Sequence, residues 1–325
     1  MPPPLDSPLV SILIPTHNRP DYFRKTLESV LAQTYKNLEI IVSDDSQDDR
    51  TETLIRTEVH DARVTYVHHK NFRMPQNITW LLSQFHGEYF QVLMDDDLIA
   101  PTKIETMVTL YEQNPSVMLI TSHRQCIDGD GQSIHGNAAT RPLADRPTRF
   151  PGKTITNFLL THQLNRIGEP STVLLRRACQ PKMLEIWQTY HANADIVTWL
   201  YLCEHGDVIY LPQTLNYFRI HGGQDQKNHH IIFEGYCEWC HIYLHAIEQT
   251  ADPSQQKKYW VKYFSNLCSL VTQTLPQLRA EIFADGETFT ANEQWLALEG
   301  AIHQIERRAQ DILFHVKSKI DTTPF

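Results

Sequence analysis

The chain lacks the features that define several large classes of protein. Its 325 residues contain no run of about 18 or more apolar residues, the length that a membrane span requires. Residues 1–8 have neither a basic segment nor an apolar core, so we expect a disordered tail and no secretory signal. Six cysteines in a chain this long do not make a disulfide framework. These absences predict a cytoplasmic protein with reduced thiols.

An excess of positive charge is also missing. The net charge is −9 and the isoelectric point is about 6.0. A general basic surface for nucleic acid or an anionic membrane is therefore not expected. Hydrophobic residues make up 41% of the chain and charged residues 21%, as in an ordinary globular protein with one large or two smaller domains.

Strand and helix patterns alternate in the first half of the chain. Apolar runs that predict strands occupy residues 9–14, 38–42, 64–67, 88–94 and 117–121. Asp21 is expected to cap the first intervening helix, and Pro101 to open the last one. This alternation predicts a mostly parallel sheet with helices on both faces. Residues 124–152 are richer in Gly, Asp, Arg and Pro and predict irregular structure or a hairpin.

The last third of the chain has a different pattern. Helical periodicity covers residues 231–247, 256–275 and 291–316. We therefore expect an α/β domain over residues 9–228 and a helical domain over residues 229–325. The helical part has no catalytic signature, and its expected roles are packing, homo-oligomerisation or an acceptor-binding wall.

Three consecutive carboxylates follow the apolar stretch Val92-Leu93-Met94. Asp95, Asp96 and Asp97 place three negative charges within about 7 Å of extended chain, where they repel each other unless a cation lies among them. Oxygen ligands suit Mg²⁺ or Mn²⁺, which keep positions open for phosphate oxygens. On an extended strand the first and third carboxylates share a face. The alternative is a solvated turn that caps the next helix.

Further motifs appear in order around this acidic triplet, and together they resemble family 2 inverting glycosyltransferases of the GT-A fold type. The resemblance covers roughly residues 9–222. Its motifs are Pro15-Thr16-His17-Asn18-Arg19, Asp44-Asp45, Asn77, Gly87-Glu88-Tyr89, the acidic triplet, residues 168–177 beginning Gly168-Glu169-Pro170-Ser171, Asp195 and Tyr217-Phe218-Arg219-Ile220-His221. It implies a GT-A-like nucleotide-binding sheet flanked by helices, followed by a helical region. It also implies a metal-dependent, inverting, hexosyl-type transfer from a nucleoside diphosphate sugar, most simply a UDP-sugar, to a hydroxyl of a glycan, lipid-linked glycan or protein.

The resemblance assigns roles to individual residues. The donor nucleotide is expected at Pro15, Thr16, His17, Arg19, Asp45, Asn77, Asp95 and Arg219, with the Asp45 carboxylate accepting an N–H of the base. The Mn²⁺ or Mg²⁺ ligands are expected to be Asp96, Asp97 and His221. The distance to Pro101 favours Asp96 as the direct ligand, whereas Asp-x-Asp spacing pairs Asp95 with Asp97.

The remaining two roles concern the acceptor. Glu169 is expected on the acceptor side. Asp195, at the start of a helical pattern, is expected to be the general base that takes a proton from the acceptor hydroxyl. Without the resemblance, Asp195 would be interpreted as a helix cap, Glu169 as an exposed loop acid, His17 as a turn residue and Arg19 as a surface cation.

Two other classes of function fit part of the pattern. A non-catalytic protein that binds sugar nucleotides, or a scaffold, would share the fold, although the intact acids argue against it. A nucleotidyltransferase would need a Gly-rich loop near the N-terminus to hold a triphosphate, and residues 9–20 contain no glycine.

One motif points away from sugar chemistry. Cys237-Glu238-Trp239-Cys240-His241 matches the c-type haem attachment pattern, which requires an exported chain. The two cysteines also lie in an amphipathic helical pattern. We therefore interpret both thiols as core residues.

Overall fold

The computed structural model describes residues 7–70, 72, 74–224, 229–248, 257–277 and 307. The chain divides into two compact units, one formed by residues 1–190 and 194–221, the other by residues 191–193 and 222–325. The helix predicted at 291–316, apart from residue 307, and most of the predicted tail lie outside the described residues.

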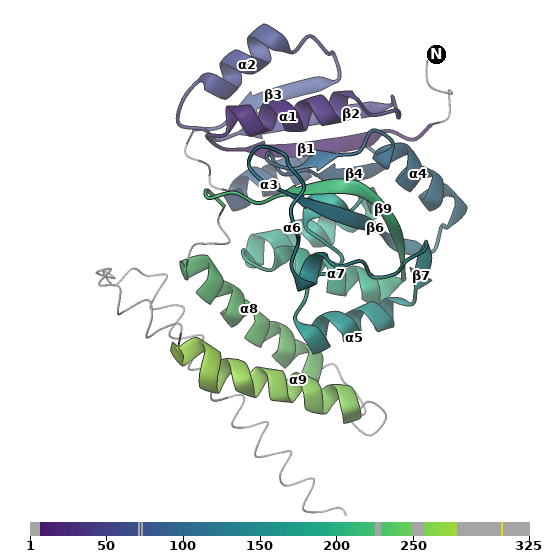
Figure 1. Ribbon diagram of the computed structural model, residues 1–325, viewed down its shortest axis with the longest axis vertical. Coiled ribbons are helices and arrows are strands. Elements are labelled where there is room, and N and C mark those ends of the chain that lie inside the picture. Colours follow the sequence, from purple (N-terminus) through teal and green to yellow (C-terminus); the bar gives the residue numbers. More distant parts are fainter. Residues whose placement is uncertain are drawn as a thin grey trace, which may run out of the picture. The chain divides into compact units, whose positions relative to one another are not determined.

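The first unit contains a five-stranded sheet in the order β3-β2-β1-β4-β8 (Figure 1). Its strands are β1 (Val10–Thr16), β2 (Leu38–Asp44), β3 (Val64–His68), β4 (Tyr89–Val92) and β8 (Leu175–Arg176). The first four are parallel and β8 is antiparallel to β4. Parallel pairing places the carboxyl ends of β1, β2 and β4 at one edge of the sheet.

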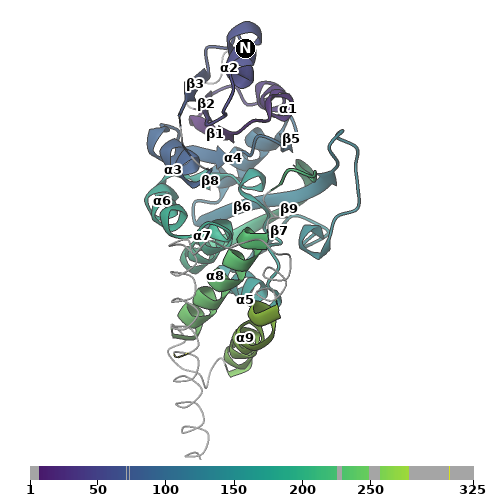
Figure 2. The ribbon, with the colours of Figure 1, turned by 90° about the vertical axis from the view of Figure 1, so that its left-hand side faces the viewer.

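Helices cover both faces of this sheet, as the alternating pattern predicted. Ile12 and Ile14 of β1 pack in a cluster with Phe23 of α1 (Pro20–Leu31), whereas Leu13 packs in a second cluster with Leu81 of α3 (Met74–Gln84). Successive side chains of a strand point to opposite faces, which explains the division. Figure 2 shows α1 and α3 on opposite sides of the strands. The remaining helices of this part are α2 (Arg50–Glu58) and α4 (Lys103–Gln113).

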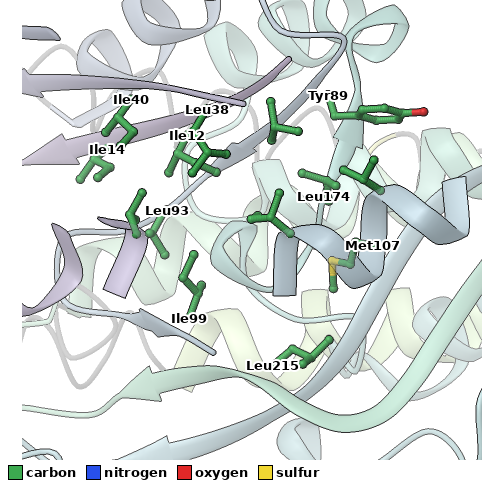
Figure 3. Packing of buried hydrophobic residues seen from close by; sticks show 14 of the residues in the cluster. Ile12, Ile14, Leu38, Ile40, Tyr89, Leu93, Ile99, Met107, Leu174 and Leu215 are labelled. Atoms are coloured by element: carbon green, nitrogen blue, oxygen red, sulfur yellow. The ribbon is translucent and has the colours of Figure 1, made fainter. Parts of the chain in front are cut away.

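A second sheet, which the sequence did not predict, follows in the same unit. It has the order β5-β9-β6, from β5 (Leu98–Ile99), β9 (Asp207–Arg219) and β6 (Val117–Ile127), and β7 (Thr148–Phe150) pairs with β9. The strand predicted at 117–121 thus belongs here. β6 and β9 pair with register shifts around Ser122 and His123, and these irregularities break the simple periodicity that reveals a strand. Figure 3 shows Ile12 and Ile40 of the first sheet in one cluster with Met107 and Leu215.

The rest of the first unit surrounds these sheets. Its elements are η1 (Ala138–Thr140), α5 (Gly152–His162), η2 (Pro170–Thr172), η3 (Arg177–Cys179), α6 (Gln180–Thr189) and α7 (Ala194–His205). The region predicted as irregular or a hairpin is both. A turn with a hydrogen bond from Gly131 N to Asp128 O follows β6, Ser133 pairs back with Ile127, and irregular chain continues to β7.

Two predicted helix starts were wrong. Helix α1 begins at Pro20 with Arg19 at the N-cap, so Asp21 lies in the first turn, where its charge favours the helix dipole. Helix α4 begins at Lys103 with Thr102 at the N-cap. Pro101 precedes that cap because a turn closed by Lys103 N and Ala100 O comes first.

The described part of the second unit is helical, as predicted for residues 231–247 and 256–275. It contains α8 (His229–Glu248), α9 (Lys257–Ser269) and the π-helical segment η5 (Leu270–Thr274). Tyr243 of α8 accepts a hydrogen bond from Asn266 of α9 at 2.9 Å.

Cys237 and Cys240 are buried, and burial raises the pKa of each thiol to about 12. Their interpretation as core residues is confirmed. Within the described ranges, no helix is long and apolar enough to cross a membrane.

Glu238 of α8 organises the short segment 191–193 of this unit. Its buried carboxylate accepts hydrogen bonds from the backbone N–H groups of His191 (2.7 Å), Ala192 (3.4 Å) and Asn193 (2.7 Å). Burial raises the pKa of Glu238, although these donors oppose the rise. The carboxylate therefore satisfies three main-chain donors that an apolar residue would leave unpaired.

We expect Glu238→Ala to lower the free energy of unfolding by about 2 kcal/mol, because buried donors lose their acceptor. Glu234→Ala is the matched control, since Glu234 lies one turn earlier and pairs with His191 at a more exposed position (2.9 Å). Its effect should stay below about 0.5 kcal/mol. Urea unfolding followed by circular dichroism measures both, and equal effects would contradict the assignment.

Candidate functional site

The predicted motifs converge at the carboxyl edge of the first sheet. Thr16, the last residue of β1, pairs with Asp44 at the end of β2, and Leu13 pairs with Val92 at the end of β4. The segments that leave these strands are 17–19, 45–49 and 93–97. Open α/β sheets bind ligands at this edge, so the topology positions the motifs for ligand binding.

The acidic triplet forms a turn. Asp97 N donates to Met94 O at 3.2 Å, and the hydroxyl of Thr26 in α1 lies 2.9 Å from Asp95 O and 2.8 Å from Asp97 O. The expectation that Asp95 and Asp97 share one face of an extended strand was wrong, because the turn directs the carboxylates to different partners. The alternative of a solvated helix cap was also wrong, since all three side chains are buried and α4 begins later.

Asp95 connects the acidic turn to the end of β1. Its carboxylate accepts hydrogen bonds from the Thr16 hydroxyl (3.0 Å) and His17 N (3.2 Å), and it pairs with Arg19 at 3.4 Å. Burial and the neighbouring Asp96 raise the pKa of Asp95 to about 7, and Arg19 opposes this rise. The contacts of Asp95 hold the β1 loop in place.

Asp96 shares the Arg19 guanidinium with Asp95 and also contacts His221, which follows β9. Its Oδ2 lies 3.0 Å from His221 Nε2 and 3.2 Å from Arg19 Nη1. The side chains of Asp96 and His221 are 8% and 10% exposed, so both are largely buried. The pair thus offers one oxygen and one nitrogen ligand at the edge of the site.

Asp97 points inward. Its Oδ1 accepts a hydrogen bond from Arg219 N at 3.0 Å, and burial raises the pKa of Asp97 well above its usual range. Lys103 is also fully buried. It donates to Ser171 O and, at 3.2 Å, to Asn216 Oδ1, and burial lowers the pKa of Lys103 while Asp97 opposes that change. Asp97 therefore belongs to a buried polar group beneath the turn.

The predicted metal trio is brought together only in part. Asp96 and His221 are adjacent, whereas the Oδ1 of Asp97 is bound to the backbone of Arg219. Across the portion of the chain that the structure describes, no three His, Cys, Asp or Glu side chains gather as a group that could hold a metal ion.

Asp45 lies beside His17 at the adjoining strand end. Asp45 Oδ1 is 3.1 Å from His17 Nδ1, and burial raises the pKa of Asp45 while His17 lowers it. Asp44 instead accepts a hydrogen bond from the Tyr66 hydroxyl at 2.7 Å and belongs to the interior. Of the acidic pair, Asp45 is thus the one that faces the β1 loop.

Asn18 joins the two loops. Its backbone has φ 53°, a left-handed conformation that asparagine tolerates better than most residues. Asn18 N donates to Ser46 Oγ at 2.7 Å, and Asn18 Oδ1 accepts from Gln47 N at 2.9 Å. The turn chemistry of Asn was the only sequence signal for this role.

Three predicted donor residues are more deeply placed. Pro15 is buried opposite Ser43 in the β1–β2 ladder, and Asn77 accepts a hydrogen bond from the Ser43 hydroxyl. The guanidinium of Arg219 is buried. It donates to the carbonyl oxygens of Asp96 (2.7 Å), Asp128 (2.9 Å) and Gly129 (3.1 Å). Arg219 therefore clamps the acidic turn to the hairpin after β6, and its contact with phosphate stays a prediction.

Asp195 and Glu169 belong to a second group of polar residues. Asp195, in the first turn of α7, accepts hydrogen bonds from Asn165 Nδ2 (2.8 Å) and Ile196 N (2.7 Å). Glu169 lies 2.7 Å from the buried Arg124. The segment from Asn165 onward reaches the acidic turn through Ser171, whose hydroxyl accepts from Met94 N at 3.0 Å.

Sequence reasoning missed several residues of this site: Thr26, Lys103, Arg124 and Asn165. Only Lys103 carried a sequence signal. It begins the stripe of α4 that continues through buried Met107 and Tyr111, where a charged residue is unexpected. The other contacts connect segments far apart in the chain.

The fold is an α/β sheet with polar side chains gathered at its carboxyl edge, and comparison gives the family. Residues 11–180 match the family described as glycosyl transferase family 2, and the chain belongs to this family. An uncharacterised glycosyltransferase of Rickettsia typhi is 36% identical over 131 residues, which is 40% of each chain. One of Haemophilus influenzae is 27% identical over 220 residues, 67% of each chain. The chain thus spans less than half the length of the Rickettsia typhi relative that it matches.

Solved structures share the fold. TarS of S. aureus, residues 1–349 in complex with UDP-GlcNAc, superposes with a TM-score of 0.61 at 14% identity, covering 91% of this chain and 81% of TarS. The mannosyltransferase PcManGT of Pyrobaculum calidifontis, in complex with GDP-Man and Mn²⁺, has a TM-score of 0.51 at 14% identity, covering 93% of this chain and 87% of PcManGT. The predicted GT-A-like α/β fold is confirmed.

Proposed function

We propose that this protein is a metal-dependent inverting glycosyltransferase that moves a sugar from a UDP-sugar to a hydroxyl acceptor. The observation that carries the proposal is the group Arg19, Asp96 and His221 at the carboxyl edge of the sheet. It combines a carboxylate and an imidazole that can ligate a metal ion with the positively charged Arg19 guanidinium, 3.2 Å from Asp96 Oδ2. Membership of glycosyl transferase family 2 and the sugar nucleotides bound to TarS and PcManGT support it.

The residues at this edge suit a divalent cation. Asp96 Oδ2 and His221 Nε2 are 3.0 Å apart, close enough to bind one ion after a small separation. A carboxylate oxygen and an imidazole nitrogen are acceptable ligands of Mn²⁺, and Mg²⁺ takes the oxygen. When bound, the cation neutralises charge on the departing diphosphate. Arg19, whose side chain is 23% exposed, supplies a second positive charge for the phosphates.

The nucleoside is assigned to the neighbouring strand end. Asp45 presents a carboxylate that accepts an N–H of the nucleotide base. His17 Nδ1, 3.1 Å from Asp45 Oδ1, orients this carboxylate. Uracil and guanine both offer such a donor, so Asp45 alone does not separate UDP-sugars from GDP-sugars. The acceptor hydroxyl belongs to a glycan, a lipid-linked glycan or a protein.

Asp195 is assigned as the general base. Its carboxylate accepts hydrogen bonds from Asn165 Nδ2 and Ile196 N, which fix its orientation. It takes the proton of the acceptor hydroxyl while that oxygen attacks the anomeric carbon from the face opposite the diphosphate. Glu169 lies on the same segment as Asn165, and its partner Arg124 of β6 also donates to Asn165 O; Glu169 is assigned to the acceptor side.

A panel of UDP- and GDP-sugars, each incubated with the full chain and Mn²⁺, tests the proposed activity. Release or transfer of the sugar from a UDP-sugar is the expected result. Binding without any turnover, with a range of hydroxyl acceptors present, would instead favour a sugar-nucleotide-binding or scaffold protein. No binding to any nucleotide sugar would overturn the proposal.

Asp96→Ala tests the metal assignment separately. We expect it to weaken UDP binding in the presence of Mn²⁺ by about 10- to 100-fold, to the level that wild type shows with chelator. Calorimetric titration with and without Mn²⁺ measures this difference. Asp61→Ala removes an aspartate that pairs with Arg63 at 2.7 Å before β3, and it should leave binding unchanged. An Asp96→Ala protein with full Mn²⁺-dependent affinity would remove Asp96 from the ligand set.

A further inference from the structure

We propose that Asn165 is a positioning residue that orients the carboxylate of Asp195, an inference that rests on the proposed role of Asp195 as base. Asn165 Nδ2 donates to Asp195 Oδ2 at 2.8 Å and lies 3.0 Å from Gly168 O. Asn165 Oδ1 accepts from Gly168 N at 3.0 Å. Rotating the amide by 180° would set its NH₂ group against an N–H donor and its oxygen against a carbonyl and a carboxylate. The contacts therefore fix the orientation of the amide.

The turn that carries Asn165 is rigid. Gly168 has φ 115°, where only glycine is unstrained, and a Cβ at this position would meet side-chain atoms of Thr172 at 2.6 Å. The indole of the fully buried Trp199 donates to Gly168 O at 3.0 Å. Arg124 Nη2 donates to Asn165 O at 2.8 Å. Arg124 thus holds the backbone of Asn165, and Trp199 holds the backbone of Gly168 at the other end of the turn.

A rigid donor has a specific consequence for Asp195. One carboxylate oxygen accepts from Ile196 N and the other from Asn165, so the plane of the carboxylate is set by two independent donors. A base oriented by a third group is the usual arrangement where a proton must be taken in a defined direction.

Asn165→Ala is expected to lower kcat by about 10- to 100-fold, as loss of one hydrogen bond to a charged group does. The KM for the donor and the Kd for UDP should change by less than about twofold. Since the lost bond favours the ionised carboxylate, the acidic limb of the pH profile of kcat should move to higher pH. The charged side chains nearby, Arg124 of β6 and Arg166 and Glu169 of the segment that carries Asn165, are unchanged in this variant.

Trp199→Phe is the control for a purely structural effect. It removes the other side-chain bond to Gly168 O and leaves the Asn165 amide in place. Its acidic limb should coincide with that of wild type. If both variants lower kcat with no shift of the limb, Asn165 supports only the turn and the proposal is overturned.

Asn165→Asp provides a second test in case the alanine variant folds poorly. It retains an acceptor for Gly168 N but sets a negative charge against Asp195, so the acidic limb should shift further than in Asn165→Ala. An unshifted limb would overturn the proposal. Full turnover by Asp195→Asn would instead show that the proposed base is wrong, which is a separate failure.

Discussion

Asp195→Asn should reduce kcat by about 10²- to 10⁴-fold, the contribution of a positioned general base. The amide has the size of the carboxylate and can still accept one hydrogen bond, but it cannot take a proton at neutral pH. The acceptor oxygen must then attack while it still carries its proton. Because Asp195 accepts hydrogen bonds from Ile196 of α7 and from Asn165, and the acidic triplet is assigned to the donor, the affinity for UDP should remain that of wild type.

Steady-state kinetics with the best donor of the panel, together with calorimetry for UDP, measure both quantities. Asp207→Asn is a suitable control, since Asp207 pairs with Arg149 at 2.7 Å at the start of β9 and its side chain is 33% exposed. That variant should keep wild-type kcat. Turnover by Asp195→Asn within threefold of wild type would exclude Asp195 as the base, and loss of UDP binding would show that it acts on the donor.

Arg219→Met should lower the free energy of unfolding by about 3–5 kcal/mol, the effect of breaking a buried charged network. The guanidinium donates to the carbonyl oxygens of Asp96, Asp128 and Gly129. Its Cζ also lies 4.9 Å from the centroid of the Tyr22 ring, a cation–π contact. Methionine fills similar space but donates no hydrogen bond, so these buried acceptors lose their partner. The acidic turn also loses the clamp that sets the direction of Asp96.

Urea unfolding of Arg219→Met, with Arg56→Met as the control, measures this cost. Arg56 is 74% exposed and forms an i,i+4 pair with Glu52, so its loss should cost less than about 0.5 kcal/mol. The loss of unfolding free energy in Arg219→Lys should lie between those of Arg219→Met and Arg56→Met. Lysine keeps the positive charge but lacks the planar set of N–H donors of the guanidinium. A destabilisation below 1 kcal/mol for Arg219→Met would mean that the clamp contributes little.

The sequence predicted the parts of the fold that depend on local pattern. The apolar run at 9–14 lies within β1, and the alternation of Ile12, Leu13 and Ile14 between two core clusters follows from strand geometry. The end of β1 meets Asp44 and Asp45 because parallel strands align their carboxyl ends. The second sheet was missed, since β9 pairs with β6 through register shifts that no local pattern reveals.

Predictions about individual side chains were less complete, and Asp97 shows why. Its spacing from Asp95 suggested a shared face, yet one hydroxyl from Thr26 bends the backbone between them into a turn. The buried Lys103 and Asn216 beneath Asp97 come from two other elements. Which of three consecutive carboxylates faces outward is therefore decided by partners far along the chain.

By itself, the sequence determined the strands of the first sheet, the edge at which its motifs gather and the residue types available there, because hydrophobic period and chain direction are local properties. Only the tertiary structure decided that Asp96 meets His221, 125 residues away, while Asp95 binds the β1 loop and Asp97 turns inward. It also decided that Asn165 faces Asp195. Hydrogen-bond direction depends on atoms placed to within a few tenths of an ångström by packing, and that information is distributed over the whole fold.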